Sequence, residues 1–427
     1  MVKLLLASDL HIGRASSRLG EHAPPDGGRA ASAWERLVET AIDRRVAAVC
    51  LAGDVVEQEA AYWEARGILE RGIDRLAAAG IVTVAVAGNH DHAVLAQLAA
   101  ALPPDRFRLL GAGGRWEEMV LAGPGGAPAL RLHGWSFPRK RVRMSPLATY
   151  DLPPGDGTPV LGMVHGDLDQ ADSPYAPLAT TELRRFPVAG WHLGHQHRPL
   201  LRDDGAPWLL YPGSLQALDP GETGVHGAWE VTVAGGTLTL PRPVPLSSVR
   251  YENLVVDVSG CGDETVLRDA VQARLADARR AAAAAGGDAL RLLRVRLAVT
   301  GSTPAAAAVA AIARGLAEVP LAGADDDLLL VVERVVDRVL PPLDLAALAS
   351  GSTPAAEVAR LLLALDGGRL DAEQQELLRR AAAAVHAVLG NAVYDLPGEF
   401  SPDEEAVRSL LRQAAEKLLR RMQEAQA

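Results

Sequence analysis

The feature that most constrains the fold is an alternation of short apolar runs with helical patterns, in which each apolar run ends at a polar motif. Residues 2–7, 46–51 and 81–87 are compact apolar runs and are predicted to be buried strands. Between them, residues 34–42 and 62–79 repeat apolar side chains at helical spacing. Strands that alternate with helices predict parallel strands joined by helical crossovers. Ligands of such sheets collect beyond the carboxyl ends of the strands, where the polar motifs lie.

The rest of the chain has a different organisation. A chain of 427 residues suggests two or three domains. Predicted strands dominate from about residue 107, and the proline-rich tract 241–245 is interpreted as a linker. Strand and helix patterns then alternate up to Pro341-Pro342, and helical patterns follow to the last residue. We therefore expect an α/β domain over residues 1–245, a smaller α/β domain over 246–340 and a helical region over 341–427.

The last helical pattern leaves two interpretations open. Its apolar stripe consists of Val407, Leu410, Leu411, Ala414, Leu418 and Met422. Such a stripe either packs on its own domain or docks a partner protein.

Composition excludes several classes of protein. Cys50 and Cys261 are the only cysteines, which excludes a disulfide scaffold and a CxxC zinc module and fits a reducing cytosol. A formal net charge of −10 argues against a protein that grips nucleic acid by bulk charge alone. Neither an export signal nor an apolar segment of the ~20 residues needed for a membrane span is visible. A cytoplasmic protein without a membrane association is expected.

Five polar motifs carry the chemistry, and each follows an apolar run. They offer carboxylate, imidazole and amide ligands without a thiolate, a mixture that suits manganese, iron, zinc or magnesium. Any one motif alone is a weak signal, whereas five at successive strand ends point to one metal cluster. In chain order they are Asp9-Leu10-His11, Gly53-Asp54, Gly88-Asn89-His90-Asp91, His165-Gly166 and Gly194-His195-Gln196-His197.

Spacing within the motifs supports a shared cluster. If the backbone stays extended past the strand end, residues i and i+2 point the same way. Both members of Asp9-x-His11 and of His195-x-His197 would then face the metals. The glycines beside the motif residues are expected to allow tight turns and the close approach of a phosphate.

Taken together, the motifs resemble the calcineurin-like, two-metal phosphoesterase superfamily. Further details resemble its DNA repair exonuclease branch, which holds the bacterial SbcD nuclease subunit and YhaO-like proteins. The resemblance implies an α/β fold with a four-layer αββα core, a smaller α/β capping domain and a helical C-terminal tail. The details are Ser8 to Gly13, Tyr175-Ala176-Pro177, Tyr211-Pro212-Gly213-Ser214-Leu215-Gln216 and Glu222-Thr223-Gly224.

The resemblance also implies a role for each motif residue. Asp54 would bridge two divalent ions, for which Mn²⁺ is the expected metal and Fe, Zn or Mg the alternatives. His90 would act in catalysis without binding a metal, either by stabilising charge or by protonating the leaving oxygen, and Asp91 would orient it. The ligands would be Asp9, His11 and His197 for one ion and Asn89, His165 and His195 for the other.

The activity implied by this resemblance is metal-dependent DNA hydrolysis with 3′→5′ exonuclease action. The implied partner is an SMC-like coiled-coil ATPase of the SbcC or YhaN type. Two alternatives stay open: hydrolysis of a small phosphodiester or phosphoprotein, and a mainly structural subunit of the ATPase complex. A homodimer through helices near residues 34–45 or 62–79 is a further implied contact. The densest basic cluster is a solvated loop or a contact for the DNA backbone; it consists of Arg139, Lys140, Arg141 and Arg143.

Overall fold

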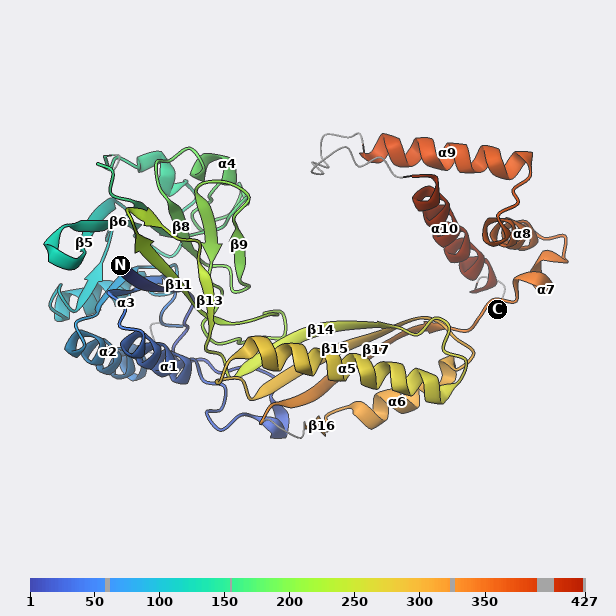
Figure 1. The fold of residues 1–427 in the computed structure, drawn as a ribbon, viewed down its shortest axis with the longest axis horizontal. Coiled ribbons are helices and arrows are strands. Elements are labelled where there is room, and N and C mark those ends of the chain that lie inside the picture. The colour runs from blue at the N-terminus through green and yellow to red at the C-terminus, as the bar shows by residue number, and fades with distance from the viewer. Residues whose placement is uncertain (58–61, 154–155, 323–326, 390–402, 425–427) are drawn as a thin grey trace. The chain divides into compact units, whose positions relative to one another are not determined.

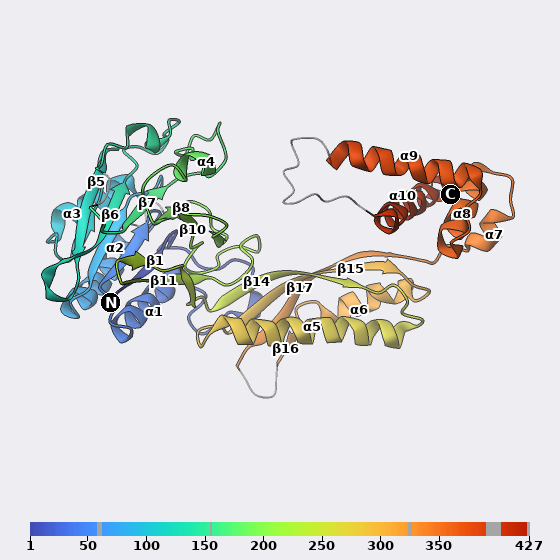
Figure 2. The same cartoon turned by 45° about the horizontal axis from the view of Figure 1, so that its top comes forward.

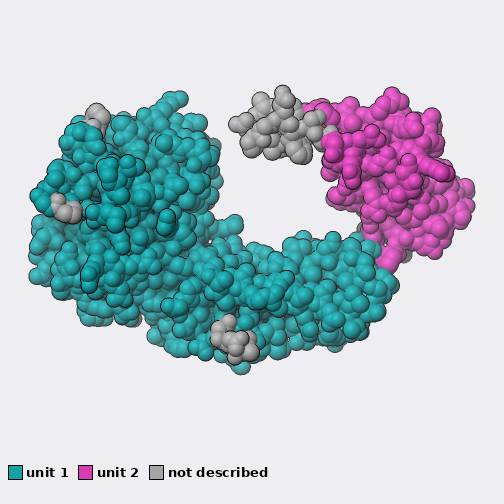
Figure 3. All heavy atoms as spheres, in the orientation of Figure 1, with its two compact units in different colours: residues 1–340 teal, residues 341–427 magenta. Residues whose placement is uncertain are grey.

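The computed structural model describes residues 1–57, 62–153, 156–322, 327–389 and 403–424. The chain divides into two compact units, residues 1–340 and residues 341–427 (Figure 3). The further division expected near residue 245 stays a prediction. None of the helices in the described ranges is both long and apolar enough to cross a membrane.

The first sheet contains the three strands that the apolar runs predict. Its strand order is β12-β11-β1-β2-β3-β4, and β13 also pairs with β11. The pairs β1–β2, β2–β3 and β3–β4 are parallel, as expected from the helical crossovers. The strands are β1 (Val2–Ala7), β2 (Ala48–Ala52), β3 (Val82–Val86), β4 (Phe107–Leu109), β11 (Gly227–Ala234), β12 (Thr237–Leu238) and β13 (Arg242–Pro245).

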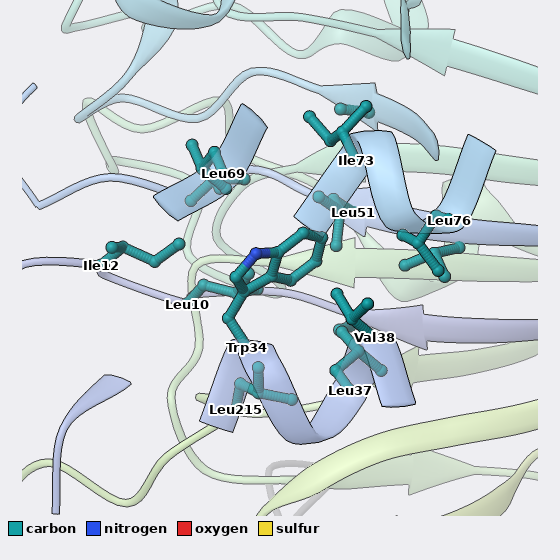
Figure 4. Packing of buried hydrophobic residues seen from close by; sticks show 14 of the residues in the cluster. Leu10, Ile12, Trp34, Leu37, Val38, Leu51, Leu69, Ile73, Leu76 and Leu215 are labelled. Atoms are coloured by element: carbon teal, nitrogen blue, oxygen red, sulfur yellow. The ribbon is translucent and has the colours of Figure 1, made fainter. Parts of the chain in front are cut away.

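Three helices cover the outer face of this sheet: α1 (Ala30–Asp43), α2 (Tyr62–Ala78) and α3 (His92–Ala101) (Figure 1). Trp34 of α1 is fully buried between α1, α2 and the strand-end segments, beside Leu69 and Ile73 (Figure 4). A methyl group at Gly72 would lie 2.7 Å from Cε2 of Trp34, so the glycine makes room for the indole ring. This packing holds the helices against the strands whose ends carry the polar motifs.

The second sheet has the strand order β5-β6-β7-β8-β10-β9. The four central strands β6, β7, β8 and β10 run parallel, and the edge strands β5 and β9 are antiparallel to their neighbours. Apolar side chains of both sheets form one core between them, which confirms the layered α/β fold. The strands are β5 (Trp116–Ala122), β6 (Pro128–Trp135), β7 (Val160–His165), β8 (Gly190–Gly194), β9 (Leu200–Arg202) and β10 (Trp208–Tyr211).

The outermost layer on the second sheet is thin. It consists of the one-turn helix α4 (Thr180–Leu183), the 3₁₀ turn Pro146–Thr149 and loops, which pack on Trp116, Trp191 and Tyr211. Large aromatic side chains therefore provide the burial that long helices provide on the other side.

A third sheet follows, with the order β14-β15-β17-β16. Helices α5 (Glu264–Gly286) and α6 (Val309–Leu316) lie on one of its faces (Figure 2). On the opposite face, Tyr251 and Leu292 pack against Leu19 and Ala217 of the first 245 residues. The strands are β14 (Val249–Asp257), β15 (Leu292–Ser302), β16 (Pro320–Leu321) and β17 (Leu329–Leu340).

The tract 241–245 was expected to be a linker, and this expectation is wrong. Residues 242–245 form β13, which pairs antiparallel with β11 over residues 227–230. Proline is tolerated in such a strand because the strand lies at a sheet edge, where the missing N–H removes no necessary hydrogen bond.

The described residues of the second unit form helices α7 (Leu345–Ala349), α8 (Pro354–Gly367), α9 (Ala372–Leu389) and α10 (Glu404–Glu424). Ala415 and Leu419 of α10 are buried against α8. Of the apolar stripe, Val407 is buried, whereas Leu410 and Leu418 are 47% and 49% exposed. Packing on the chain's own unit accounts for only part of the stripe, and the exposed leucines keep the partner interpretation open.

Candidate metal centre

All five polar motifs meet at one edge of the two sheets. Asp9 and His11 follow β1, Asp54 follows β2, and Asn89 to Asp91 follow β3 in the first sheet. His165 ends β7, and His195 and His197 follow β8 in the second sheet. The expected gathering at the carboxyl ends of parallel strands is confirmed.

The side chains form two adjoining groups that each suit a metal ion. Asp9, His11 and His197 form one group and Asp54, His165 and His195 the other, with the ligand atoms of each group within 4.8 Å of one another. Nε2 of His11 lies 3.0 Å from Nε2 of His197. Nε2 of His165 lies 3.1 Å from Oδ1 of Asn89 and 3.4 Å from Oδ2 of Asp54.

This arrangement fits two divalent ions. Two imidazole nitrogens that face one another, with carboxylates beside them, are donors arranged around a cation. The structure brings the seven predicted ligands together, with Asp54 in the group of His165 and His195; the bridging role of Asp54 and metal binding by each residue stay predictions.

The backbone route to this geometry differs from the expected extended one. Asp9, His11, Asp54 and His195 have φ angles of 51°, 47°, 50° and 103°, in the left-handed region. Non-glycine residues there cost on the order of 1–3 kcal/mol each and persist only when their surroundings hold them. The amides of Asp9 and His11 donate to the carbonyls of Gly53 and Asp54, both at 3.0 Å. The neighbouring strand end therefore stabilises the strained turn.

The motif glycines make room for the site residues themselves. A Cβ at Gly53 or at Gly194 would lie 2.6 Å from Nδ1 of His165, and a Cβ at Gly88 would overlap the Asp54 carboxylate. The glycines therefore allow close packing of the candidate ligands, and the approach of a phosphate stays a prediction.

Each predicted histidine ligand has a second partner at its other ring nitrogen. Nδ1 of His165 hydrogen-bonds the Ala52 carbonyl at 2.9 Å. The other three contact carboxylates that sequence reasoning did not select as site residues. The contacts are His11 Nδ1 to Glu57 Oε2 at 2.7 Å, His195 Nε2 to Asp167 Oδ1 at 3.3 Å and His197 Nδ1 to Glu222 Oε1 at 2.8 Å.

Such outer partners orient metal-bound histidines. Glu57 and Asp167 lie three and two residues after Asp54 and His165, so nearness to a motif was the available signal. Glu222 lies in a recognised motif to which no role was given.

Electrostatics at the centre favour positive charge. Burial opposes ionisation of Asp54, yet the neighbouring His165 and His11 lower its pKa. Burial acts to lower the pKa of His165, but the charge of Asp54 outweighs it and raises the pKa to about 9. The centre therefore meets the electrostatic requirement of a cation site.

His90 lies beside the candidate ligands, and Asp91 makes contacts other than the expected one. The His90 ring centroid lies 5.5 Å from that of His11, and its Nδ1 lies 2.9 Å from the Glu57 carbonyl oxygen. The fully buried Asp91 carboxylate instead accepts hydrogen bonds from the amides of Val55 and Gly88, at 2.6 and 2.8 Å. The expectation that Asp91 orients His90 is corrected: Asp91 ties two strand-end loops together, because its short side chain turns back to its own loop.

The basic cluster lies beside this centre. Arg139, Lys140, Arg141 and Arg143 are all exposed. In the described part of the chain, none of the four pairs with a carboxylate. Val142, within the cluster, exchanges backbone hydrogen bonds of 2.8 and 2.7 Å with Pro174 and Ala176. Tyr175 between them has its ring centroid 5.1 Å from that of His195. The loop is therefore connected to a predicted ligand through one aromatic residue.

Comparison with known proteins agrees with the site. Residues 2–232 match a family profile described as the calcineurin-like phosphoesterase superfamily domain. Residues 251–339 match the middle domain of the metallophosphoesterase YhaO. A relative from Bacillus subtilis (strain 168), an uncharacterised metallophosphoesterase YhaO, is 25% identical over 238 residues. That match covers 55% of this chain and 57% of the relative, so the chain spans little more than half of the relative's length.

Among solved structures, a dimetal phosphatase from Danio rerio matches with 13% identity and a TM-score of 0.36, over 55% of this chain and 93% of its own. A putative 5′-nucleotidase from Staphylococcus aureus matches with 12% identity and a TM-score of 0.36, over 58% and 54%.

The layered fold, the two groups of candidate ligands and the family profile agree on one class of protein. The chain belongs to the calcineurin-like phosphoesterase superfamily.

Proposed function

We propose that this protein is a two-metal-dependent DNA nuclease of DNA repair. It would hydrolyse phosphodiester bonds mainly as a 3′→5′ exonuclease, with endonuclease activity as a second mode, and would act with an SMC-like coiled-coil ATPase. The observation that carries the DNA assignment is the exposed basic loop, residues 139–143, attached beside the candidate metal centre.

The loop supplies what the rest of the chain lacks. The formal net charge is −10, so bulk attraction to DNA is weak. Four cations lie within five residues, and none of them contacts a carboxylate of the described residues, so they can contact phosphates next to the scissile bond. Such contacts position a polyanionic strand and add little for a small diester.

The chain's own groups divide the catalytic work. Bound divalent ions would supply Lewis-acid chemistry, which lowers the pKa of water and neutralises phosphate charge. Nδ1 of His90 donates a hydrogen bond to the Glu57 carbonyl oxygen, and in the imidazolium form Nε2 carries the second proton, which it would give to the leaving oxygen. Asp54 contacts the His165 side of the centre and accepts the His90 amide at 3.0 Å, so it couples the metal centre to the acid.

Because the acidic chain attracts DNA only weakly, a partner protein that binds DNA would hold the substrate at the site. We propose that the helical unit, residues 341–427, docks the ATPase, which would be of the SbcC or YhaN type. Its exposed leucines, Leu363, Leu377, Leu410 and Leu418, support this surface. The two cysteines are free and buried, which supports a reducing, cytoplasmic location.

One experiment tests the nuclease assignment. The full chain is incubated with Mn²⁺ and three substrates: end-labelled duplex DNA, single-stranded DNA and bis-p-nitrophenyl phosphate. The proposal expects cleavage of DNA and of the small diester, with the DNA reaction falling steeply as salt rises. Turnover of the small diester without any DNA product would instead indicate a small-substrate phosphodiesterase.

A second measurement tests the partnership. Activity on DNA is compared with and without a purified coiled-coil ATPase from the same genome, using wild type and Leu410→Glu with Leu418→Glu. Stimulation that the double variant loses, while its unfolding temperature is unchanged, supports docking through α10. Equal stimulation of both proteins would move the docking surface elsewhere.

A further inference from the structure

We propose that Glu222 is a positioning residue for His197, whose carboxylate sets the imidazole tautomer that binds a metal through Nε2. The inference rests on the two-metal function proposed above, but it concerns ion binding and not DNA. It also gives a role to the Tyr211–Gln216 and Glu222–Gly224 motifs, which the sequence singled out without one.

The Glu222 carboxylate is fully engaged. It is only 6% exposed, and its Oε1 lies 2.8 Å from Nδ1 of His197. Oε2 accepts hydrogen bonds from Oγ of Ser214 at 2.6 Å and from the amide of Leu218 at 2.7 Å. Both oxygens thus act as hydrogen-bond acceptors, as those of a carboxylate do. Three donors around two oxygens hold the side chain in one orientation.

The turn that follows β10 lies against His197 and helps to hold the Glu222 carboxylate beside it. The Ser214 amide donates to the His197 carbonyl at 2.9 Å, so the turn contacts the histidine through its backbone as well. Gly213 has a φ of 79°, and a Cβ there would lie 2.7 Å from the same carbonyl oxygen. Ser8, next to Asp9, forms an isolated parallel β-bridge with Ser214. Both motifs thus attach Glu222 to the strand ends that carry the ligands.

The chemistry of the pair determines which nitrogen faces the ions. A carboxylate only accepts hydrogen bonds, so Nδ1 of His197 carries the proton and Nε2 carries the lone pair. Nε2 is the atom that lies 3.0 Å from Nε2 of His11 and 3.9 Å from Asp9. The negative charge also makes the imidazole a stronger donor to a cation.

A glutamine at this position gives the decisive test. In Glu222→Gln, the amide oxygen satisfies the two donors Ser214 and Leu218, which turns the NH₂ group toward Nδ1 of His197. His197 then accepts at Nδ1 and carries its proton on Nε2, the tautomer that cannot bind a metal. Glu222→Ala removes more packing but leaves the tautomer free to adjust.

Manganese binding to the metal-stripped full chain is measured by titration calorimetry and by electron paramagnetic resonance, for wild type, Glu222→Gln and Glu222→Ala. Glu118→Gln is the matched control, because Glu118 contacts Nε2 of His133 at 2.9 Å, and His133 is not among the motif residues. Thermal unfolding of each metal-free protein records any general loss of structure.

We expect wild type and Glu118→Gln to bind two ions. In Glu222→Gln, one ion should bind roughly 10–100-fold more weakly, with the spectrum of an isolated ion replacing that of a coupled pair. Glu222→Ala should bind that ion at least as well as Glu222→Gln.

Wild-type affinity of Glu222→Gln for both ions would overturn the inference, and so would equal loss of both ions. Weaker ion binding by Glu222→Ala than by Glu222→Gln would indicate that Glu222 acts through packing, and would also overturn the inference. A wild-type chain that binds fewer than two ions would overturn it as well. Failure of the nuclease assignment is distinguishable, because a protein that cuts no DNA still reports on Glu222 through manganese binding.

Discussion

Two glutamate–histidine pairs in this protein have nearly the same contact and different surroundings. Glu222 contacts His197 at 2.8 Å at the metal centre, and Glu118 contacts His133 at 2.9 Å between β5 and β6. His133 has no nitrogen to spare, since its Nδ1 lies 2.5 Å from the Tyr150 hydroxyl. Nε2 of His197 faces His11 and Asp9. A paired histidine belongs to a metal site when its remaining nitrogen meets other ligands, and to the scaffold when both nitrogens are taken.

Electrostatics separate the same two histidines. Burial lowers the pKa of His133 more than Glu118 raises it, and the positive charge of Arg131 adds a smaller lowering effect. Burial also acts to lower the pKa of His197, but Glu222, Asp9 and Asp54 together raise it. A surplus of negative charge thus marks the metal centre, and charge balance marks the scaffold pair.

The largest effect is expected from Asp54→Asn, which removes the carboxylate shared by the proposed ions. The substitution keeps the side-chain size but removes the charge that favours cations at both groups. Mn²⁺ stoichiometry, measured by elemental analysis after gel filtration, should fall from two, and turnover of bis-p-nitrophenyl phosphate should disappear. An Asp54→Asn protein that still holds two ions would contradict the bridging role.

A smaller loss is expected when the acid is removed and the ligands stay. His90→Ala should retain both ions and lose turnover by about 10²–10⁴-fold, the usual contribution of general acid–base catalysis. Ion content and rate are measured on the same preparation. Loss of metal in proportion to the loss of rate would show that His90 is a ligand.

The basic loop differs from the two glutamate–histidine pairs because its cations contact no carboxylate among the described residues. Replacing Arg139, Lys140, Arg141 and Arg143 by serine should weaken DNA binding and flatten its dependence on salt. The logarithmic slope should change by about 0.9 for each DNA phosphate that the loop no longer neutralises. Fluorescence anisotropy with labelled duplex DNA at several salt concentrations measures this slope. An unchanged slope would show that the loop is solvated and does not contact DNA phosphates.

The smallest effect on catalysis is expected at the scaffold pair. Glu118→Gln should destabilise the protein by about 1–3 kcal/mol, because it leaves the buried His133 poorly paired. Chemical denaturation measures this change, and ion content should equal that of wild type. Loss of an ion in this variant would remove the distinction between the two pairs.

Much of the fold and of the candidate site was predictable from local pattern. The apolar runs that became β1, β2 and β3 are short, continuous and followed by glycine-containing motifs, so their strand ends were visible. The motif residues were predictable because carboxylates and histidines at several strand ends of a parallel sheet have few other uses.

The prediction failed where a local pattern has two physical solutions. Residues 241–245 carry prolines that suit either a linker or an edge strand, and only pairing with β11 distinguishes them. The α10 stripe left packing and partner docking open, and packing on α8 buries Ala415 and Leu419 while Leu410 and Leu418 stay exposed.

By itself, the amino-acid sequence determined which residues gather at the metal centre, because strand direction and the position of each motif after its strand follow from local hydrophobic period. Tertiary structure alone decided how these residues are held. The left-handed turns at Asp9, His11 and His195, and the carboxylates of Glu57, Asp167 and Glu222 behind the histidines, depend on contacts between distant segments. A hydrogen bond between residues that far apart in the chain leaves no periodic signal in the sequence, and this is why Glu222 was recognised as part of a motif but not as a partner of His197.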